Sequence, residues 1–362
     1  MSDLQYWLAL NLLPDIGPVL SRRLLSAYGT PANIFDATFQ ELKSVEGVGE
    51  SRAGKIVNFK NWDAVKREID FADRSDIKII PLNSPLYPAI LKEISGAPPV
   101  IYMKGELTDA DRYSVAMVGS RAYTPYGRHM AEKIANRLAS CGLTVVSGMA
   151  RGIDTASHRG ALESGGRTIA VLGSGLDVPY PASNRELMGS IEKAGAVISE
   201  FPLGTKPLRE NFPRRNRIIS ALSIGVLVVE ATLDSGSLIT VSYALEQGKD
   251  IFAVPGNINS RTSKGTNELI KKGAKLVESA EDIIYELGPQ LKGIIKQNRE
   301  KPLPGMTDDE KSIVDNLSPE PKHIDAIVRE MRIPPPRALS ILLSLELKGI
   351  VRQAEGKSFF IN

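Results

Sequence analysis

Short apolar runs alternate with segments of helical periodicity between residues 78 and 287, and this alternation constrains the fold more than any other feature. The runs predicted to be strands are Ser114–Val118, Leu143–Ser147, Arg167–Leu172, Ala196–Ser199, Ile224–Glu230, Asp250–Val254 and Ala274–Val277. Between most of them lies a segment with a 3.6-residue period, such as Gly127–Ser140 or Leu238–Glu246. Strands and helices that alternate in this way form βαβ units. We therefore predict an α/β domain with a doubly wound, mainly parallel sheet and helices on both faces.

Two further regions flank this domain. Residues 1–75 are predicted to form short helices separated by Gly and Pro turns. Residues 288–306 are predicted to be a linker, because they contain several Gly, Pro and charged residues. Residues 307–362 predict three helices and a hairpin around Gly356, which is the pattern of a winged helix. The third of these helices carries only Arg337 and Lys348 as basic residues, so it favours an auxiliary or protein-interaction role over DNA contact.

The composition excludes some classes of protein. No apolar run approaches the roughly 18 residues that a membrane span needs. The chain has one cysteine, Cys141, so a disulfide framework is excluded and a reducing, cytoplasmic compartment is expected. The formal net charge of +3 is too small to indicate nucleic-acid binding by itself. Any such function has to rest on where the basic residues cluster.

Small-residue turns follow four of the predicted strands. They are Gly119-Ser120-Arg121, Gly148-Met149-Ala150-Arg151-Gly152, Gly173-Ser174-Gly175 and Asp234-Ser235-Gly236-Ser237. In a Rossmann-like sheet, ligands bind at the carboxyl ends of the strands, where such turns present backbone N–H groups to anions. Parallel sheets also use glycine at these bends for packing alone. Four such turns together favour phosphate binding, with candidate contacts at Gly119, Ser120, Arg121, Gly148, Gly152, Gly173, Gly175, Ser235, Gly236 and Ser237.

The densest group of basic residues is the segment Arg209–Arg217. It sets four arginines, Arg209, Arg214, Arg215 and Arg217, against one glutamate, with Phe212 among them. Guanidinium groups suit phosphates, and an aromatic ring can stack on an unpaired base. The alternative is a solvated helix start whose Phe212 packs into the core. The combination favours single-stranded nucleic acid, whose bases are free to stack.

A weak internal repeat occurs near the N-terminus. Residues 15–25 align without gaps on residues 47–57, and the second copy has the form of a helix-hairpin-helix motif. Gly47 and Gly49 permit the tight hairpin, and the N–H groups of the following helix can hold a phosphate. Arg52 and Lys55 add positive charge, so these four residues are candidates for an auxiliary DNA contact. The alternative is a helical hairpin with a purely structural role.

Other kinds of site are disfavoured. Residues 49–55 have the spacing of a P-loop, but Ile56 stands where a Ser or Thr should bind magnesium. The third glycine of a dinucleotide fingerprint is absent after Gly173-Ser174-Gly175. The three histidines are far apart in sequence, so we expect no metal site and no cofactor. Asp154 and His158 lie four residues apart, where a structural role is favoured over a catalytic dyad.

The central region closely resembles the DNA-processing protein A family (DprA, also called Smf). The motifs that carry the resemblance are Tyr87-Pro88 with Ala97-Pro98-Pro99, Val118-Gly119-Ser120-Arg121, residues 147–158, residues 172–177 with Tyr180-Pro181, residues 212–219, Ser235-Gly236-Ser237 and Val254-Pro255-Gly256. The flanking helical (helix-hairpin-helix or SAM-like) and winged-helix parts resemble longer members of the family, with weaker signals.

The resemblance implies a bacterial, non-enzymatic protein that coats incoming single-stranded DNA during natural transformation, helps to load the RecA recombinase and acts as a homodimer. It implies that Gly119, Ser120 and Arg121 hold backbone phosphate. The segment Arg209–Arg217 would line the same groove, with Phe212 as the base contact. Ala182 departs from the family, because this position is often basic there, and Arg185 is the candidate to replace it.

An enzymatic alternative stays open at this point. Pro255-Gly256 followed by Gly265-Thr266-Asn267-Glu268 is similar to the signature of nucleotide N-glycosidases of the lysine-decarboxylase-like phosphoribohydrolase class. Eight residues separate the two halves here, so we do not expect Glu268 beside a bound nucleotide.

Overall fold

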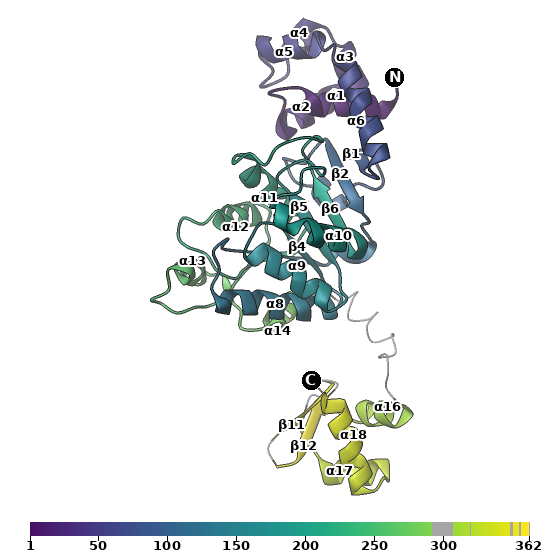
Figure 1. The fold of residues 1–362 in the computed structure, drawn as a ribbon, viewed down its shortest axis with the longest axis vertical. Coiled ribbons are helices and arrows are strands. Elements are labelled where there is room, and N and C mark those ends of the chain that lie inside the picture. The colour runs from purple at the N-terminus through teal and green to yellow at the C-terminus, as the bar shows by residue number, and fades with distance from the viewer. Residues whose placement is uncertain (292–306, 319, 348–349, 355, 362) are drawn as a thin grey trace. The chain divides into compact units, whose positions relative to one another are not determined.

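The structure, a computed structural model, describes residues 1–291, 307–318, 320–347, 350–354 and 356–361. The chain divides into two compact units, Met1–Asn298 and Arg299–Asn362 (Figure 1). No helix of these described ranges is long and apolar enough to cross a membrane.

The first unit is built on a nine-stranded sheet in the order β1-β2-β6-β5-β4-β3-β7-β8-β9. Its strands are β1 (Lys78–Pro81), β2 (Val100–Gly105), β3 (Ser114–Val118), β4 (Thr144–Ser147), β5 (Thr168–Leu172), β6 (Ala196–Ser199), β7 (Gly225–Val228), β8 (Asp250–Ala253) and β9 (Lys275–Leu276). The neighbours from β6 to β9 pair in parallel, whereas β1 pairs antiparallel with β2, and β2 with β6. The predicted mainly parallel sheet is therefore confirmed, and the antiparallel β1 and β2 were not predicted.

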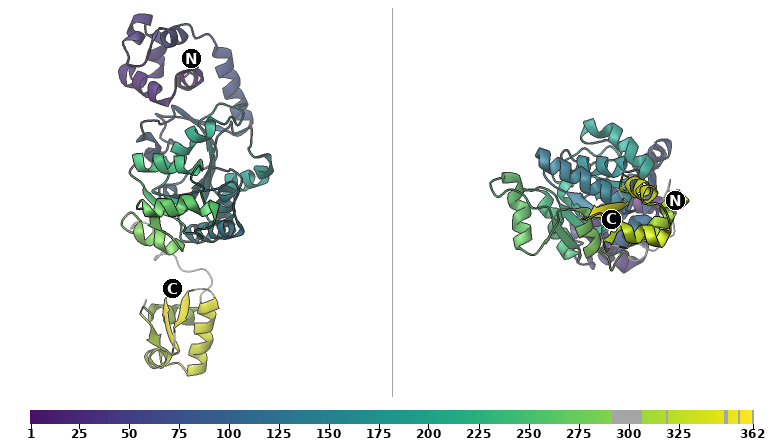
Figure 2. Two further views of the ribbon diagram at one scale, coloured as in Figure 1. Left: turned by 90° about the vertical axis from the view of Figure 1, so that its left-hand side faces the viewer. Right: turned by 90° about the horizontal axis from the view of Figure 1, so that it is seen from below.

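Helices cover both faces of this sheet (Figures 1 and 2). Along β3, Val115 and Met117 face one layer, whereas Ala116 and Val118 face the other, as the period of two in a strand requires. The first layer contains α8 (Pro125–Ser140), α9 (Ile153–Glu163) and α14 (Ala280–Glu286). The second contains α7 (Ala89–Lys92), α11 (Asn211–Ala221) and α12 (Ser237–Glu246). Strands buried on both sides account for the continuous apolar runs in the sequence.

Two helices of the sheet domain remain, α10 (Arg185–Ala194) and α13 (Lys264–Lys271). Helix α10 packs beside α9, and α13 packs against β8. After α14, Leu287 and Leu291 are buried in the same core as β3 and α8. The packed chain therefore continues at least to Leu291, which lies inside the predicted linker 288–306; residues 292–306 of that linker lie outside the described residues.

The N-terminal helices are α1 (Asp3–Leu12), α2 (Pro18–Tyr28), α3 (Pro31–Asp36), α4 (Phe39–Lys43), α5 (Glu50–Val57) and α6 (Trp62–Arg74). The sequence repeat forms two similar hairpins. Asp15 and Gly47 occupy equivalent positions with φ of 66° and 86°, and the next glycines, Gly17 and Gly49, are the N-caps of α2 and α5. The Glu68 carboxylate accepts hydrogen bonds from the Tyr102 hydroxyl at 2.9 Å and from the Leu203 N–H at 2.8 Å, which ties α6 to the sheet domain.

The second unit is a winged helix, as predicted. It contains α16 (Asp308–Asp315), α17 (Ile324–Met331) and α18 (Pro335–Leu347), with a three-stranded sheet in the order β10-β12-β11. The strands are β10 (Lys322–His323), β11 (Val351–Ala354) and β12 (Ser358–Ile361). In α18, the Arg337 guanidinium forms an ion pair with Asp309 at 2.6 Å, and Lys348 lies outside the described residues.

Candidate nucleic-acid interface

The turns after β3, β4 and β5 lie side by side, because these three strands are neighbours in the sheet. The backbone N–H of Ile153 donates to the Ser120 carbonyl at 3.1 Å, which joins the first turn to the second. Gly152 has φ of 91°, and a Cβ on it would collide with the Ser120 carbonyl oxygen and the Arg121 backbone. Only glycine fits this approach. We use the name rim for these turns (residues 119–121, 148–152 and 173–175) together with the segment Arg209–Arg217.

Arg121 is the exposed cation of the first turn. The Ser120 N–H donates to the Glu230 carbonyl at 2.7 Å, and the Ser120 hydroxyl donates to the Ala122 carbonyl at 2.9 Å. These donors are therefore occupied within the protein, contrary to the expectation that Ser120 holds a phosphate. The Arg121 guanidinium carbon lies 5.0 Å from the centre of the Phe212 ring. Of the two side chains of this turn, Ser120 and Arg121, that of Arg121 is thus the one that a phosphate can reach.

Phe212 lies at the start of α11, half-buried among groups of the rim. Its ring packs on the turn after β5, where a Cβ on Gly173 would stand 3.0 Å from the ring. The Tyr180 ring lies near it, with 5.6 Å between the ring centres. The ring therefore packs against the turn after β5, while Phe212 as a residue is only partly buried; its contact with a base stays a prediction.

Arg215 points into the protein. Its side chain is only 3% exposed, and its guanidinium donates to the Gly148 carbonyl at 2.5 Å and to the Val171 carbonyl. These carbonyls belong to the ends of β4 and β5. Burial lowers the pKa of Arg215 to about 10, against the opposing effect of Asp154. Arg215 was expected to contact phosphate, but in this position it joins the turn after β4 to the end of β5.

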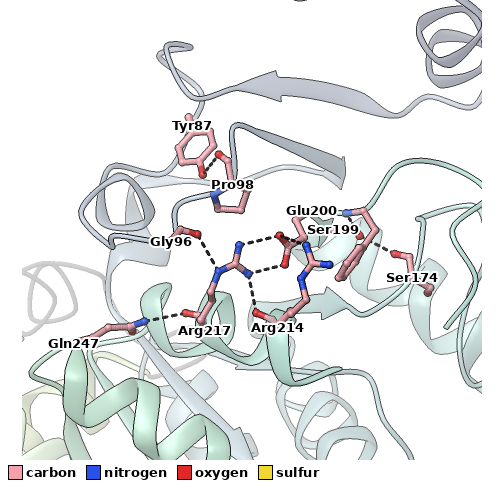
Figure 3. Close-up of polar contacts among 10 residues, drawn as sticks. Tyr87, Gly96, Pro98, Ser174, Ser199, Glu200, Arg214, Arg217 and Gln247 are labelled. Atoms are coloured by element: carbon pink, nitrogen blue, oxygen red, sulfur yellow. Dashed lines mark hydrogen bonds and ion pairs between the residues drawn. The ribbon is translucent and has the colours of Figure 1, made fainter. Parts of the chain in front are cut away.

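Arg217 is also committed to the protein (Figure 3). Its two terminal nitrogens donate to the Glu200 carboxylate at 2.6 and 2.8 Å, and its Nε donates to the Gly96 carbonyl at 2.9 Å. Glu200 is 5% exposed, so this two-pronged ion pair is largely desolvated. The Arg217 backbone carbonyl accepts a hydrogen bond from the Gln247 amide at 3.2 Å. The expectation that Arg217 binds phosphate is not met in this arrangement.

Arg209 and Arg214 are exposed. The Arg214 side chain is 53% exposed, lies over the Phe201 ring at 5.3 Å and stands 4.0 Å from the Glu200 carboxylate, beside Arg217 (Figure 3). Because Arg217 already neutralises Glu200, the Arg214 guanidinium keeps its donors for another anion. The segment therefore presents two arginines to solvent and turns two inward.

The remaining predicted contacts are Arg185, the turn Ser235–Ser237 and Gly175. Arg185 is exposed at the start of α10. The hydroxyls of Ser235 and Ser237 are hydrogen-bonded to each other at 2.8 Å, and the Gly236 carbonyl accepts from the Asn216 amide of α11 at 3.3 Å. The Gly175 N–H donates to the Thr205 carbonyl at 3.0 Å, so this donor is used to fix the loop.

The candidate residues of the N-terminal hairpins contact one another. Arg52 donates to the Asp15 carbonyl at 3.1 Å and to the Gly47 carbonyl at 2.8 Å, which bridges the two hairpins. Lys55 forms an ion pair with Asp15, and this pair holds the pKa of Asp15 below its usual value. The Gly49 N-cap lies beside them, exposed. The structure therefore gives Arg52 and Lys55 a structural role and does not bring them to the rim.

Asp154 and His158, the candidates for a catalytic dyad, have separate partners. Asp154 accepts a hydrogen bond from the Ala150 N–H at 3.3 Å, whereas the His158 Nδ1 lies 2.7 Å from the Thr168 hydroxyl, so the two do not pair. Burial raises the pKa of Asp154 and lowers that of His158 to about 3. Within the described ranges, no group of three or more His, Cys, Asp or Glu residues is arranged to hold a metal ion.

The two halves of the glycosidase-like signature do meet. The Asn267 amide donates to the Gly256 carbonyl at 2.9 Å and accepts from its N–H at 3.2 Å. Glu268, however, forms a solvent-facing ion pair with Lys272 at 3.5 Å. The acidic residue of the signature thus pairs with a lysine of the helix region that follows it, and this pair faces solvent.

Two residues that shape the rim were not singled out from the sequence. Glu200 receives Arg217, as described above, and Asn184 donates to the Met149 carbonyl at 3.0 Å. Met149 has φ of 61°, which is costly for a residue with a side chain, and Asn184 helps to hold it there. Neither pairing has a local sequence signal, because the partners are far apart along the chain.

Comparison with known proteins agrees with this architecture. The family model described as DNA recombination-mediator protein A matches residues 78–288, the DprA winged helix domain matches residues 297–357, and the SAM-like helix-hairpin-helix tandem matches residues 8–59. Protein Smf of Escherichia coli is 34% identical over 98% of this chain and 95% of its own length. DNA processing protein DprA of Streptococcus pneumoniae is 48% identical over 55% of this chain and 71% of its own length.

Two solved structures are similar in fold. The DprA structure from Streptococcus pneumoniae has a TM-score of 0.68 and 36% identity, over 79% of this chain and 98% of that one. DNA processing protein A from Helicobacter pylori, whose structure is described as giving insights into a unique single-stranded DNA binding mode, has a TM-score of 0.53 and 30% identity, over 59% of this chain and 96% of that one. The motifs, the fold and these matches together place the chain in the DNA recombination-mediator protein A family.

Proposed function

We propose that the chain binds single-stranded DNA along the rim, without strong sequence preference and without chemistry on the DNA. The observation that carries this proposal is the half-exposed Phe212 ring beside the exposed guanidinium of Arg121, at the carboxyl ends of β3 to β5. Ligands of open α/β sheets bind at this edge. The single-stranded DNA binding mode described for the Helicobacter pylori relative supports the same substrate here.

The roles of the side chains follow from their exposure. Arg121, Arg209 and Arg214 contact the phosphate backbone, which carries charge but no sequence information. Phe212 stacks on a base, a contact worth about 1–3 kcal/mol that is available only when the base is unpaired. Arg185 and the turn Ser235–Ser237 are proposed to contact the backbone farther along the strand.

The glycines of the rim have a different role from the arginines. Gly148 lies against the Arg215 guanidinium and Gly173 against the Phe212 ring, so both permit close packing. We propose that their contribution to DNA binding is to let Arg215 and Phe212 reach their positions. Direct phosphate contacts through the N–H groups of Gly119 and of these turns would add to the arginine contacts.

Membership of the family supports the wider role. We infer that the protein acts in the cytoplasm in DNA processing for natural transformation and recombination, that it helps to load the RecA recombinase, and that it works as a homodimer. A binding role is favoured over catalysis because Asp154 and His158 are buried and apart, and because Glu268 is paired with Lys272.

Fluorescence anisotropy with a labelled oligothymidine and with a duplex of equal length, at one salt concentration, tests the proposal. We expect the single strand to bind tighter, since the duplex offers no base face to Phe212. A mixed-sequence strand should bind about as well as oligothymidine. Equal affinity for strand and duplex would contradict the proposal.

A further inference from the structure

Tyr180 is an exposed aromatic residue beside the rim, and the proposed function assigns it no role. It lies on the loop that follows β5 and is 42% exposed. Its ring centre is 5.6 Å from that of Phe212, and the two ring planes are inclined by 52°. Two aromatic rings therefore stand side by side at the carboxyl end of the sheet, with Arg121 on Phe212.

The hydroxyl of Tyr180 distinguishes it from the structural tyrosines of this unit. The Tyr87 hydroxyl donates to the Pro98 carbonyl at 2.8 Å (Figure 3), and the Tyr102 hydroxyl donates to Glu68 at 2.9 Å. Both of these side chains are buried. The Tyr180 hydroxyl, in contrast, makes no hydrogen bond with the described part of the chain. A buried tyrosine normally satisfies this group within the protein, whereas the hydroxyl of the exposed Tyr180 is left to solvent and its ring is accessible to a ligand.

The loop that carries Tyr180 is fixed at several points. The Ser199 hydroxyl donates to the Ser174 carbonyl at 2.7 Å (Figure 3), and the Ser174 hydroxyl donates to the Val178 carbonyl at 2.7 Å. After Tyr180, Pro181 is buried, and the Asn184 amide ties the chain to the turn after β4. An aromatic ring on a fixed loop loses little conformational freedom when a ligand stacks on it.

We propose that Tyr180 is a second base-stacking residue, so that Tyr180 and Phe212 receive two different bases of one bound strand. This inference rests on the proposed function, since it needs a single-stranded ligand on the rim. The inclination of 52° means that the two rings do not form one parallel stack, and each offers its own surface to a base. Stacking of this kind tolerates any sequence, because every base has a π face.

The test compares variants of the full chain by fluorescence anisotropy on a labelled oligothymidine and on an abasic strand of equal length. We expect Tyr180→Ala to weaken binding of oligothymidine by about fivefold to tenfold. Tyr180→Phe should bind like the wild type, because the ring and not the hydroxyl makes the contact. On the abasic strand, wild type and Tyr180→Ala should bind equally. Tyr285→Ala, which removes a ring that is 86% exposed on α14, is the matched control and should change neither affinity.

A second arm separates direct stacking from an indirect effect through Phe212. If Tyr180 acted only by supporting the Phe212 ring, Tyr180→Ala would cause no further loss in a Phe212→Ala background. We expect a further loss of about fivefold there. Unchanged oligothymidine binding by Tyr180→Ala, or an equal loss on the abasic strand, would overturn the inference. If the wild type itself does not bind oligothymidine, the proposed function fails instead.

Discussion

The inner and outer halves of the segment Arg209–Arg217 are alike in composition and opposite in environment. The inner half turns Arg215 onto the carbonyls of Gly148 and Val171, and Arg217 onto Glu200. The outer half leaves Arg209 and Arg214 in solvent. From the sequence alone, all four arginines are equal candidates for contact with DNA. The structure separates them into two that support the binding surface and two that are exposed for contact with the ligand.

Replacing one arginine from each half gives the largest expected effect. Arg215→Met leaves two buried carbonyls without their donor and Asp154 without its cation, so it should lower the free energy of unfolding by about 3 kcal/mol. Arg214→Met is the matched control on the same helix and should change it by less than about 0.5 kcal/mol. Urea denaturation measures both. Equal losses would show that the division by burial is wrong.

Helical spacing is consistent with the burial of one of the inner arginines, Arg215. Arg215 lies three and four residues before Ile218 and Ile219 and seven before Leu222, all of which are buried. This spacing places the arginine on the buried face of α11. The partners of the inner arginines could not be predicted, because Gly148, Val171 and Glu200 come from other strands and are brought together only by the sheet.

The same limit applies to the fold. The parallel strands β3 to β8 could be predicted because burial on both faces makes each a largely apolar run, whereas the edge strand β9 has two exposed residues. Strands β1 and β2 pair antiparallel, the helix between them, α7, has only four residues, and β2 directly follows Pro98-Pro99. Four residues are too few to show a helical period, so the sequence here lacks the alternation of strand and helix on which the prediction depended.

Replacing Phe212 should give the next largest effect, and it separates base stacking from the phosphate contacts of Arg209 and Arg214. Phe212→Ala should weaken oligothymidine binding by about tenfold, because a stacked base is worth about 1–3 kcal/mol. The dependence of affinity on salt should not change, since no charge is removed. Phe212→Leu keeps an apolar side chain without a π face and should lose nearly as much affinity. A salt dependence that falls as it does for an arginine variant would argue against stacking.

A change of pH should alter the stability of the fold through buried His158 and leave DNA binding by the exposed arginines unchanged. Burial lowers the pKa of His158 to about 3, from about 6.5 in an unfolded chain. His158 therefore binds a proton in the unfolded state but not in the folded state over this range. Stability is lost as the pH falls from about 6.5 toward 3. Between pH 7 and 5.5 the loss attributable to His158 should be about 1 kcal/mol.

The control for this experiment is His158→Gln, in which that part of the pH dependence should disappear. Urea denaturation at both pH values measures the stability. Over the same range, we expect the affinity for oligothymidine to stay constant. If His158→Gln keeps the full pH dependence of the wild type, the assignment to the buried histidine is wrong.

The salt dependence of DNA binding tests the central claim most directly. Each phosphate contact on a single strand contributes about 0.7 to the slope of log affinity against log salt concentration. The variant that carries Arg121→Gln, Arg209→Gln and Arg214→Gln together should therefore lose about 2 from the slope of the wild type on oligothymidine. A folded triple variant with an unchanged slope would contradict the account, because the phosphates would then be held elsewhere than by the outer arginines of the rim.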